Sequence, residues 1–435
     1  MTTSAAVRSF KDLGVSKPLV ASLAASGITE PFPIQAETLP STLAGRDVLG
    51  RGRTGSGKTL AFALPLVSRL AEREAAYRRR PGRPLGLVLA PTRELATQIN
   101  ATIEPLANEL GLNTTVIYGG VSQQRQEKAL RAGVDIVVAC PGRLEDLMRQ
   151  KILTLETVEI TVLDEADHMA DLGFLPVVQR LLAATPAQGQ RMLFSATLDN
   201  GVDKLVRRFL SNPLTHSVDD PQAAVTTMEH HVLVVADQAA KRQLIGTLAS
   251  GRGRRVLFTR TKHQARKLAK SLTDAGIPAV DLHGNLSQNA RDRNLAEFSS
   301  GEVRVLVATD VAARGVHVDE VELVVHVDPP TEHKAYLHRS GRTARAGSDG
   351  TVVTVAVPEQ KHEVGKMMKA AGVDVAFENV SPGSELVARL VGEVAATVDP
   401  QVRKAVLEAG RAANHGQGRS TGANAQRKRA ARGTG

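Results

Sequence analysis

The sequence contains no tryptophan, a single cysteine and few aromatic residues, and each scarcity excludes a class of protein. One thiol, Cys140, cannot form an internal disulfide framework, which excludes a disulfide-stabilised secreted scaffold and favours a reducing cytoplasm. Aromatic residues make up 3% of the chain, too few for a protein that binds single strands mainly by stacking bases on rings. No apolar run is long enough to cross a bilayer, and residues 1–10 lack the apolar core of a secretory signal, so we expect no membrane partner.

The length and the charge indicate how many domains to expect and what kind of partner. A chain of 435 residues exceeds what one ordinary core organises, which predicts two domains plus extensions. The formal net charge of +10 suggests a polyanionic partner, although it would also serve simply to keep a surface soluble. If the polyanion is a nucleic acid, phosphate and sugar should carry most of the contact.

Short β-branched runs alternate with helical stretches along most of the chain. Most runs are apolar on both faces, which is typical of a parallel sheet covered by helices on each side. We predict strands at residues 85–90, 114–118, 135–139, 159–163 and 192–194, and again at residues 231–235, 255–259, 279–282, 303–308, 323–327 and 351–357. This alternation predicts two α/β doubly wound domains, at residues 1–220 and 221–380, followed by an extension at residues 381–435.

Polar stretches mark the expected boundaries and loops. The break between the domains is expected within residues 219–227, and an arginine-rich insertion at residues 78–84 should be a surface loop. Beyond about residue 410 the chain has basic but no acidic residues and cannot bury a core. We therefore expect a disordered basic tail, either a solubility device or a loose contact with the polyanion. Residues 385–410 are compatible with a helix that packs, dimerises or binds another protein.

The strongest local signal is a glycine-rich loop between a short apolar segment at residues 47–49 and a helical run at residues 60–70. In a P-loop, glycines let backbone N–H groups wrap phosphate oxygens, and the next helix N-terminus adds favourable charge. Lys58 would reach the β- and γ-phosphates, and the Thr59 hydroxyl would bind Mg²⁺. A chance glycine-rich turn would lack this flanking strand and helix. The pattern predicts a nucleotide site formed by Gly52, Arg53, Thr54, Gly55, Ser56, Gly57, Lys58 and Thr59.

An acidic turn, Asp164 to Asp167, directly follows the apolar run at residues 160–163. A carboxylate at the carboxyl end of a strand points into the crevice where such sheets bind ligands. Asp164 can hold Mg²⁺ through its water shell, and Glu165 can orient and deprotonate an attacking water. Alone, such a turn would usually be a helix N-cap, but its pairing with a P-loop in one domain favours the catalytic interpretation.

A third group of residues, 338–345, is rich in arginine and follows the predicted strand at residues 323–327. An arginine from outside the P-loop domain can stabilise the charge that builds on the γ-phosphate, an effect worth roughly 10³–10⁵ in rate. A basic surface helix is the alternative. We predict that the catalytic residues are Lys58, Asp164, Glu165, Arg342 and Arg345.

Together, and in this order and spacing, the motifs resemble those of the DEAD-box ATP-dependent RNA helicases of superfamily 2, bacterial type, from about residue 10 to residue 357. The resemblance implies two tandem RecA-like domains with doubly wound parallel sheets, and ATP and Mg²⁺ as cofactors. Residues 27–35 resemble the Q motif, and Phe10 resembles its isolated upstream aromatic. This implies that Gln35 reads the adenine edge and that Phe10 packs on the ring. An amide can pair with both the amino group and N7 of adenine, so ATP is favoured over GTP.

Further segments resemble RNA-contacting motifs, and those of the first domain each follow a predicted strand. Backbone amides near glycines, together with guanidinium groups, suit phosphate binding. By resemblance, the RNA contacts are Thr92, Arg93, Gly119, Gly120, Pro141, Gly142, Arg143, Thr259, Arg260, Gln288, Arg291 and Thr309. The motif that touches both nucleotide and RNA is similar to residues 312–317, with Gly315 and His317. Coupling of ATP state to RNA binding, through hydrogen bonds to Asp167, is implied for Asp167, Ser195, Thr197, His338 and Arg339.

Four positions depart from the family pattern. His317 stands where Asp is usual, and a neutral imidazole can make only one hydrogen bond to the ribose, so nucleotide affinity or its pH dependence can differ. Cys140 replaces the usual Thr and loses one hydroxyl to RNA. Ile28 replaces the common aromatic of the Q motif, and His168 replaces the usual Arg after the acidic turn. None of these changes removes a group that phosphoryl transfer requires.

We expect ATP and RNA together to close the two domains, so that strands separate locally without long translocation or an RNA–protein complex is remodelled. The expected RNA is single-stranded or a short duplex bound with little sequence preference, and the expected protein is a cytoplasmic monomer. A superfamily 2 DNA helicase or translocase and an ATP-independent RNA-annealing chaperone are the alternatives. The Q motif and residues 195–197 favour RNA, and Lys58, Glu165 and Arg342 favour catalysis. Ribosome-assembly or RNA-decay proteins are possible partners, and cold adaptation, ribosome assembly and RNA decay all remain open as pathways.

Overall fold

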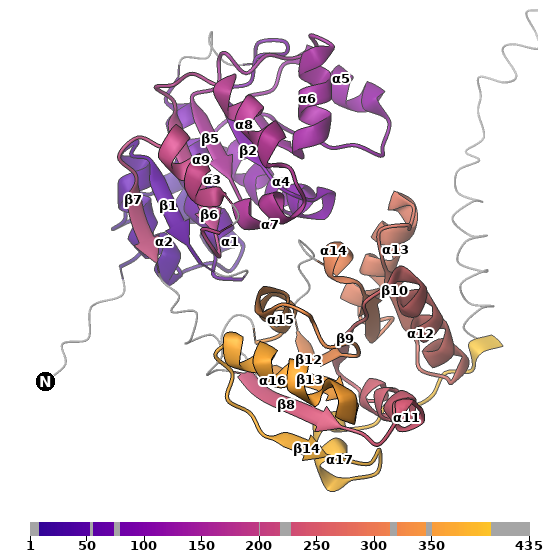
Figure 1. The fold of residues 1–435 in the computed structure, drawn as a ribbon. Coiled ribbons are helices and arrows are strands. Elements are labelled where there is room, and N and C mark those ends of the chain that lie inside the picture. The colour runs from indigo at the N-terminus through magenta and orange to yellow at the C-terminus, as the bar shows by residue number, and fades with distance from the viewer. Residues whose placement is uncertain are drawn as a thin grey trace, which may run out of the picture.

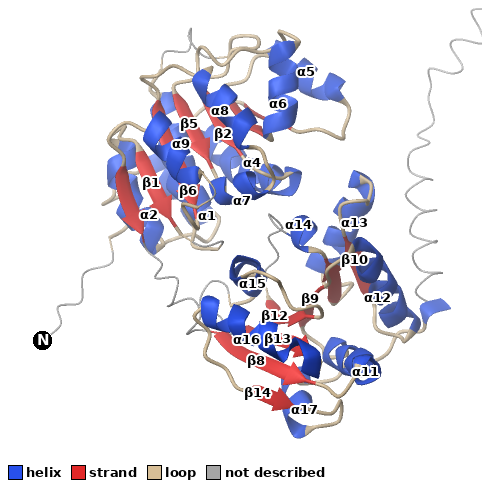
Figure 2. Cartoon of the chain, in the orientation of Figure 1, coloured by secondary structure: helices blue, strands red, loops and turns tan. Residues whose placement is uncertain are grey.

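The computed structural model describes residues 8–52, 55–73, 79–199, 201–217, 228–313, 320–344 and 350–401. Within these ranges the chain forms two α/β domains, each built on one parallel sheet (Figures 1 and 2). The predicted fold class, two tandem doubly wound parallel-sheet domains, is confirmed. The predicted break at residues 219–227 and the predicted disordered basic tail lie outside the described residues.

The first sheet has seven described strands in the order β3-β4-β2-β5-β6-β1-β7, and every neighbouring pair is parallel. Six of them lie where the sequence indicated a strand or a short apolar segment. The seventh, an edge strand with mostly exposed side chains, carries no apolar pattern that would reveal it. The strands are β1 (Val48–Arg51), β2 (Gly86–Leu89), β3 (Thr114–Ile117), β4 (Ile136–Ala139), β5 (Ile160–Leu163), β6 (Gln190–Ser195) and β7 (Leu214–Ser217).

Helices cover both faces of this sheet, because successive strand side chains point to opposite faces and both sets are apolar. In β2, for example, Val88 joins one buried cluster while Leu87 and Leu89 join the other. The first face is covered by α1 (Lys17–Ala25), α2 (Pro33–Leu43), α3 (Lys58–Ala71) and α4 (Arg93–Glu109). The second face is covered by α5 (Gln123–Ala132), α6 (Pro141–Arg149), α7 (Ala166–Asp171), α8 (Leu175–Ala183) and α9 (Val202–Phe209).

The second sheet, again with seven described strands, repeats this arrangement as β10-β11-β9-β12-β13-β8-β14, also with parallel pairing throughout. The short edge strand β14 was not predicted, because three residues carry too little pattern. The strands are β8 (Met228–Val234), β9 (Arg254–Phe258), β10 (Ala279–Leu282), β11 (Val305–Ala308), β12 (Val321–His326), β13 (Gly350–Ala356) and β14 (Phe377–Asn379).

Helices again pack on the two faces of the second sheet. One face carries α11 (Gln238–Ala249), α12 (Lys262–Asp274) and α17 (Glu385–Val391). The other carries α13 (Gln288–Ser299), α14 (Asp310–Ala313), α15 (His333–Ser340) and α16 (Lys361–Ala370), the last preceded by the short 3₁₀ helix η2 (Pro358–Gln360). Several of these helices begin at an N-cap residue. The Asp237 side chain, for instance, accepts hydrogen bonds from N–H groups in the first turn of α11.

Within the described part of residues 385–410, the first seven residues are helical, and residues 400 and 401 are helical again. Helix α17 buries Val387 and Val391 against the second domain and ends at Gly392, whose φ of 67° suits glycine. The following residues run along the same domain, where the N–H groups of Ala395 and Val398 donate to backbone carbonyls (2.9 Å each). Of the roles left open by the sequence, the described part therefore packs on the second domain, and residues 402–410 lie outside the described ranges.

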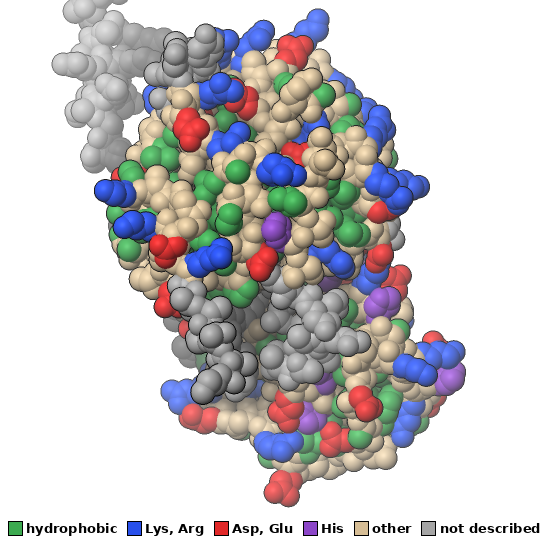
Figure 3. Space-filling model, turned by 90° about the vertical axis from the view of Figure 1, so that its left-hand side faces the viewer, with side chains coloured by type: hydrophobic (Ala, Val, Ile, Leu, Met, Phe, Trp, Pro, Cys, Tyr) green, Lys and Arg blue, Asp and Glu red, His purple; other side chains and the backbone are tan. Residues whose placement is uncertain are grey.

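The described surface carries no sign of a membrane segment, since none of its helices combines the length and apolarity that crossing a bilayer requires. Figure 3 shows Lys and Arg side chains interspersed with Asp and Glu on the face that it presents. The excess of positive charge is therefore not gathered into one patch on that face.

Candidate functional site

The predicted motifs of both domains gather at the carboxyl edges of the two sheets. In the first domain the P-loop follows β1, the Q motif precedes β1 at the start of α2, and the other motifs follow β2, β3, β4, β5 and β6. In the second domain they follow β9, β10, β11 and β12. Figure 1 shows α4 and α7 of the first domain on the side that faces α13, α14 and α15 of the second. Ligands of open parallel sheets bind at this edge, so the fold brings the motifs to the expected place.

A hydrogen bond joins the Q motif to the P-loop, and further bonds lie within each of them. The Gln35 side chain is 1% exposed; its Nε2 donates to the Gly57 carbonyl (2.8 Å), and its Oε1 accepts from the Phe32 N–H (2.9 Å). Lys58 is the first residue of α3 and is also buried, with Nζ donating to the Gly52 carbonyl (2.5 Å). The two bonds orient the Gln35 amide, and its nitrogen and oxygen can each still make a second hydrogen bond. That it reads the adenine edge stays a prediction.

The aromatic residues near the P-loop differ from the sequence interpretation. Phe10 is 2% exposed and packs in the core cluster of the first domain, so its ring does not present an open face for adenine. Phe32, by contrast, is 47% exposed and lies so close to Gly57 that a β-carbon built there would be 2.5 Å from its ring. Phe10 therefore serves the core, and the exposed ring at the P-loop belongs to Phe32.

The two acidic side chains after β5 titrate in opposite directions. Burial raises the pKa of Asp164 to about 7, an effect that Lys58 opposes and the Glu165 charge reinforces. Burial would also raise the pKa of Glu165, but the hydrogen bond from His168 and the charges of His168, Lys58 and Arg342 outweigh it and hold that pKa at about 2. A carboxylate with so low a pKa stays ionised near neutral pH, so it can accept a hydrogen bond from a water and orient it.

Asp167 forms the predicted hydrogen bonds with the segment that ends β6. Its carboxylate accepts from the Thr197 N–H (3.0 Å) and the Thr197 hydroxyl (3.3 Å). Its own N–H donates to the Ser195 Oγ (3.2 Å), and that hydroxyl donates to the Thr197 carbonyl (2.7 Å). The acidic turn and residues 195–197 are therefore linked directly, which is the contact that a coupling role requires.

Arginines of the second domain occupy different positions around α15. Arg339 is 4% exposed and makes a two-pronged ion pair with Asp310 (2.5 and 2.8 Å), so it fixes α14 against α15. Arg342, just beyond α15, lies near enough to Glu165 of the first domain to lower its pKa. His338 lies on α15 as well and is half-buried. The predicted catalytic residues Lys58, Glu165 and Arg342 are therefore brought together across the cleft.

The predicted RNA-contacting residues also meet across the domains. Arg93 donates to Gln288 Oε1 (2.9 Å), and the guanidinium of Arg291 pairs with Glu94 (2.8 Å), which Gln288 also contacts (3.3 Å). Gly120 has φ of 77°, and a β-carbon there would meet the Arg93 guanidinium at 2.3 Å. Two strand ends of the first domain and one helix of the second thus share one cluster of polar groups.

The other predicted RNA contacts lie along the same edges. Thr92 caps α4, where its hydroxyl accepts from the Leu95 N–H (3.2 Å), and the Arg260 N–H donates to Asp328 (2.9 Å). Thr259 follows β9 and is 1% exposed, so only its neighbours offer an open surface. The remainder stand directly after strands β3, β4 and β11: Gly119, Pro141, Gly142, Arg143 and Thr309. Five predicted site residues, Arg53, Thr54, Gly315, His317 and Arg345, lie outside the described residues.

Four side chains take part in the site without having been assigned a role from the sequence. Glu94 pairs with Arg291, and Asp199 pairs with Lys334 of the second domain (2.6 Å). His168 contacts Glu165. An acid next to a predicted RNA-binding arginine carries no pattern that reveals an interdomain partner, so no local signal would have found the two contacts between the domains. The contact of His168 spans only three residues, and the sequence had marked that position as a departure from the family pattern.

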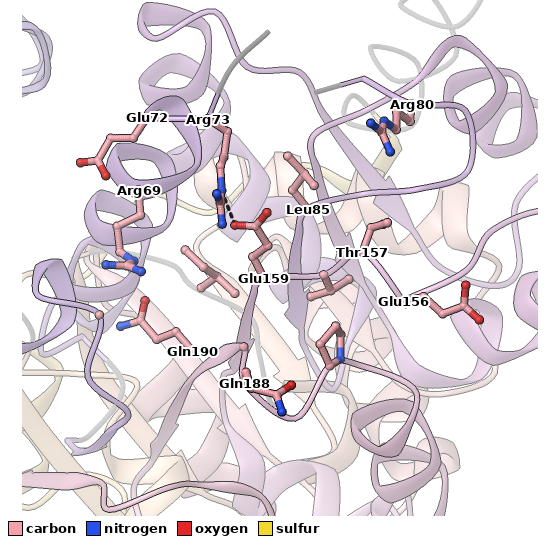
Figure 4. A pocket seen from close by; sticks show the side chains of 15 residues that line it. Arg69, Glu72, Arg73, Arg80, Leu85, Glu156, Thr157, Glu159, Gln188 and Gln190 are labelled. Carbon is pink, nitrogen blue, oxygen red and sulfur yellow. Dashed lines mark hydrogen bonds and ion pairs between the residues drawn. The ribbon is translucent and has the colours of Figure 1, made fainter. Parts of the chain in front are cut away.

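A separate pocket of about 690 Å³ lies at the opposite, amino-terminal edge of the first sheet. Its lining includes Leu85, Ile160 and Gln190, at the starts of β2, β5 and β6. Arg73 and Glu159 form an ion pair within it (2.7 Å; Figure 4). None of the predicted site residues lines this pocket, so it is distinct from the nucleotide site.

A P-loop domain and a second domain of equivalent sheet order, with carboxylates on one side of the cleft and an arginine on the other, define a two-domain RecA-like nucleotide-binding protein. Family models agree: residues 32–205 match the DEAD/DEAH box helicase model, and residues 239–347 match the helicase conserved C-terminal domain. The chain belongs to the DEAD-box ATP-dependent RNA helicases, as the sequence resemblance indicated.

Individual relatives support this membership. An ATP-dependent rRNA helicase, rrp3 of Neosartorya fischeri, is 41% identical over 355 residues, which cover 81% of this chain and 74% of that protein. The chloroplastic DEAD-box ATP-dependent RNA helicase 3A of Zea mays is 42% identical over 380 residues, 86% of this chain. The chain spans 50% of that relative's length. Among solved structures, Dbp5 of S. cerevisiae bound to RNA and ADP BeF3 superposes with a TM-score of 0.78 at 27% identity, covering 88% of this chain and 100% of that one.

Proposed function

We propose that this protein is an ATP-dependent RNA helicase in which RNA stimulates ATP hydrolysis. Hydrolysis drives local, non-processive unwinding of short RNA duplexes or the remodelling of RNA–protein complexes. The rrp3 relative is named as an rRNA helicase, and the Dbp5 structure holds RNA and a nucleotide analogue.

The observation that carries this proposal is the approach of Arg342 to Glu165 across the cleft. Arg342 belongs to the second domain, whereas Glu165 and Lys58 belong to the first, and the charges of Arg342 and Lys58 both act on the Glu165 carboxylate. A γ-phosphate held by the P-loop would meet positive charge from both domains, and a guanidinium supplied in this way contributes roughly 10³–10⁵ in rate. Hydrolysis therefore depends on closure of the domains.

The donor set beside the P-loop fits Mg²⁺. This ion prefers oxygen ligands, keeps several of its waters and needs only one or two protein groups when a phosphate supplies the rest. Asp164 offers a carboxylate at 3% exposure, and Thr59 offers a hydroxyl in the first turn of α3. A bound cation would also favour the ionised form of Asp164, whose pKa burial raises to about 7. When bound with ATP, the ion would neutralise charge that develops on the phosphates.

RNA binding follows from the same closure. The polar groups of Arg93, Gln288 and Arg291 lie together only when the two domains meet, so a continuous phosphate-binding edge exists in the closed arrangement. Contacts to phosphate are sequence-tolerant, and for single strands log affinity should fall with log salt concentration by about 0.7 for each phosphate neutralised. We further propose that the protein works in the cytoplasm, a location that its single cysteine favours.

ATP hydrolysis by the whole chain, measured with single-stranded RNA, with DNA of the same sequence and with neither, tests the proposal. We expect stimulation by RNA, loss of turnover in Glu165→Gln with ATP-dependent RNA binding retained, and a larger loss of turnover than of ATP binding in Arg342→Ala. Equal stimulation by DNA would favour a DNA helicase or translocase. Equal strand separation with and without ATP would favour an annealing chaperone, and full activity of Glu165→Gln would remove the role assigned to that residue.

A further inference from the structure

His168 lies three residues after Glu165 and turns back toward it. Its ring Nδ1 is 3.1 Å from Glu165 Oε2, and its backbone N–H donates to Asp167 Oδ1 (3.0 Å). The side chain is 2% exposed, and within the described part of the chain its Nε2 has no hydrogen-bond partner. A ring nitrogen that faces a carboxylate must carry the proton, so Nδ1–H is the donor.

Burial makes this hydrogen bond informative. A polar ring enclosed by the core with one nitrogen unsatisfied is unfavourable unless the other nitrogen makes a strong interaction. In His168, the nitrogen that has a partner donates to Glu165, whose carboxylate is close enough to Lys58 of the P-loop to be affected by its charge. A leucine or methionine would fill the same space without an unsatisfied group, so packing alone does not account for a histidine.

The backbone of Glu165 has an unusual conformation. Its φ of 48° and ψ of 53° place it in the left-handed region, which non-glycine residues rarely adopt and which persists where the surroundings impose it. The backbone angles fix where the side chain of Glu165 begins but leave the rotation of its carboxylate open. A donor at Oε2 fixes the plane of the carboxylate group.

We propose that His168 is a positioning residue for ATP hydrolysis, with Nδ1–H holding Glu165 Oε2 so that the carboxylate meets the attacking water in a productive orientation. This inference rests on the proposed function, because it needs Glu165 to act on that water. Since the Nδ1 proton makes the contact whether or not Nε2 is protonated, the role does not depend on titration of the ring. The hydrogen bond from His168 is also the first of the effects that keep the Glu165 pKa low.

Two polar variants of similar size separate positioning from packing. The side-chain nitrogen of asparagine falls near the place of Nδ1, whereas that of glutamine reaches the place of Nε2 and cannot donate to Oε2 in the same way. With saturating RNA, His168→Gln should lower kcat about tenfold or more, with the KM for ATP within about threefold of the wild type, since small misplacements of catalytic groups have effects of this size. His168→Asn should retain most of the wild-type kcat.

The outcomes are distinguishable from those of the proposed function. If the wild-type chain shows no RNA-stimulated hydrolysis, the proposed function fails. If the wild type is active and His168→Gln keeps its kcat, or if both variants lose activity equally while binding ATP and melting like the wild type, the positioning role is overturned. In the Glu165→Gln background, adding His168→Gln should reduce single-turnover hydrolysis no further, because residues that act as a unit are not additive.

Discussion

His326 shows how burial at one residue makes stability depend on pH. It is fully buried on β12, with Nδ1 3.0 Å from the Thr354 hydroxyl and its ring packed edge-on against Tyr336 at 5.0 Å. Burial, reinforced by the charges of Arg339 and His230, holds the pKa of His326 well below its usual value near 6.5. The folded domain therefore keeps this ring neutral under conditions in which the unfolded chain would protonate it.

The sign of the resulting pH effect follows from linkage. A depressed histidine pKa gives stability that is fully present above pH 6.5 and is lost as the pH falls from there toward the folded value. The free energy of unfolding should decline below pH 6.5 by up to about 1.4 kcal/mol per pH unit from this group. His326→Gln should flatten that slope between pH 6 and pH 5 in urea unfolding curves, whereas His263→Gln, on an exposed position of α12, should leave it unchanged. An unchanged slope in the His326 variant would contradict the account.

At the residue scale, the sequence could indicate chemistry but not surroundings. The glycine-rich loop and the acidic turn each have a pattern that names their residues, and both lie where they were expected. Phe10 was assigned to the adenine ring by resemblance, whereas in the structure its side chain is buried in the core cluster of the first domain. Glu94 acts through Arg291, a partner distant in sequence that only the folded chain brings near.

At the scale of elements, the P-loop and the start of α2 behave as one unit. Gly57 has φ of 86°, and a β-carbon at this position would lie 2.5 Å from Phe32 and 2.6 Å from the Gln35 amide. Gly57→Ala should therefore break the hydrogen bond between Gln35 and the loop and raise the KM for ATP at least tenfold, because both the φ angle and the contact are unfavourable.

A matched substitution tests whether this effect is local. Gly246→Ala lies within α11 and meets nothing within 4 Å, so it should leave the KM for ATP unchanged and the domain stable. Calorimetric titration with ATP would show the difference. Equal affinities for the two variants would mean that the loop and the Q motif are not coupled.

Most of the strands that the sequence could predict are apolar on both faces. Strands such as β2 and β11 are buried on each side, so their composition alone reveals them. The edge strands β7 and β14 are exposed or short, and their pairing comes from neighbours that are distant in sequence. The stretch at residues 385–410 is compatible with a helix by sequence, yet in its described part α17 ends at Gly392 and residues 400 and 401 are helical again.

At the scale of the whole molecule, closure is stabilised by ion pairs whose burial differs. The side chains of Arg291 and Glu94 are 13% and 9% exposed, whereas those of Lys334 and Asp199 are 23% and 57% exposed. Buried pairs respond more strongly to loss of a partner than exposed pairs, which typically contribute about 0–1 kcal/mol. The Glu94 contact should therefore matter more for closure than the Asp199 contact.

Glu94 gives an unusually clear test, because its charge has the same sign as RNA. If Glu94 only repelled phosphate, Glu94→Ala would strengthen RNA binding. As a contact that holds the closed arrangement, its loss should weaken RNA binding at least tenfold in the presence of a non-hydrolysable ATP analogue, and ATP binding without RNA should not change. Glu127→Ala, on the partly exposed α5, is the control and should change neither affinity. Tighter RNA binding by Glu94→Ala would contradict the role in closure.

The relation between the domains had no local signature in the sequence. Each domain can be predicted from its own strands and helices, because each buries its own clusters. The contacts described between them join residues that are distant in the chain, such as Arg93 and Gln288, which are 195 positions apart. Only the chemistry of phosphoryl transfer, which needs charge from both sides, suggested that the domains should meet there.

The most direct test of the account measures the distance between the domains. Dyes attached to cysteines introduced by Lys128→Cys on α5 and Lys267→Cys on α12, two exposed positions, would report closure by single-molecule energy transfer. Cys140→Ser removes the native thiol, so that only the introduced cysteines react. The account predicts a short-distance state that dominates only when a non-hydrolysable ATP analogue and RNA are both present, and that is lost in Arg342→Ala. The same distance in every condition, or full closure with RNA alone, would contradict the claim that the nucleotide joins the two domains into one RNA-binding surface.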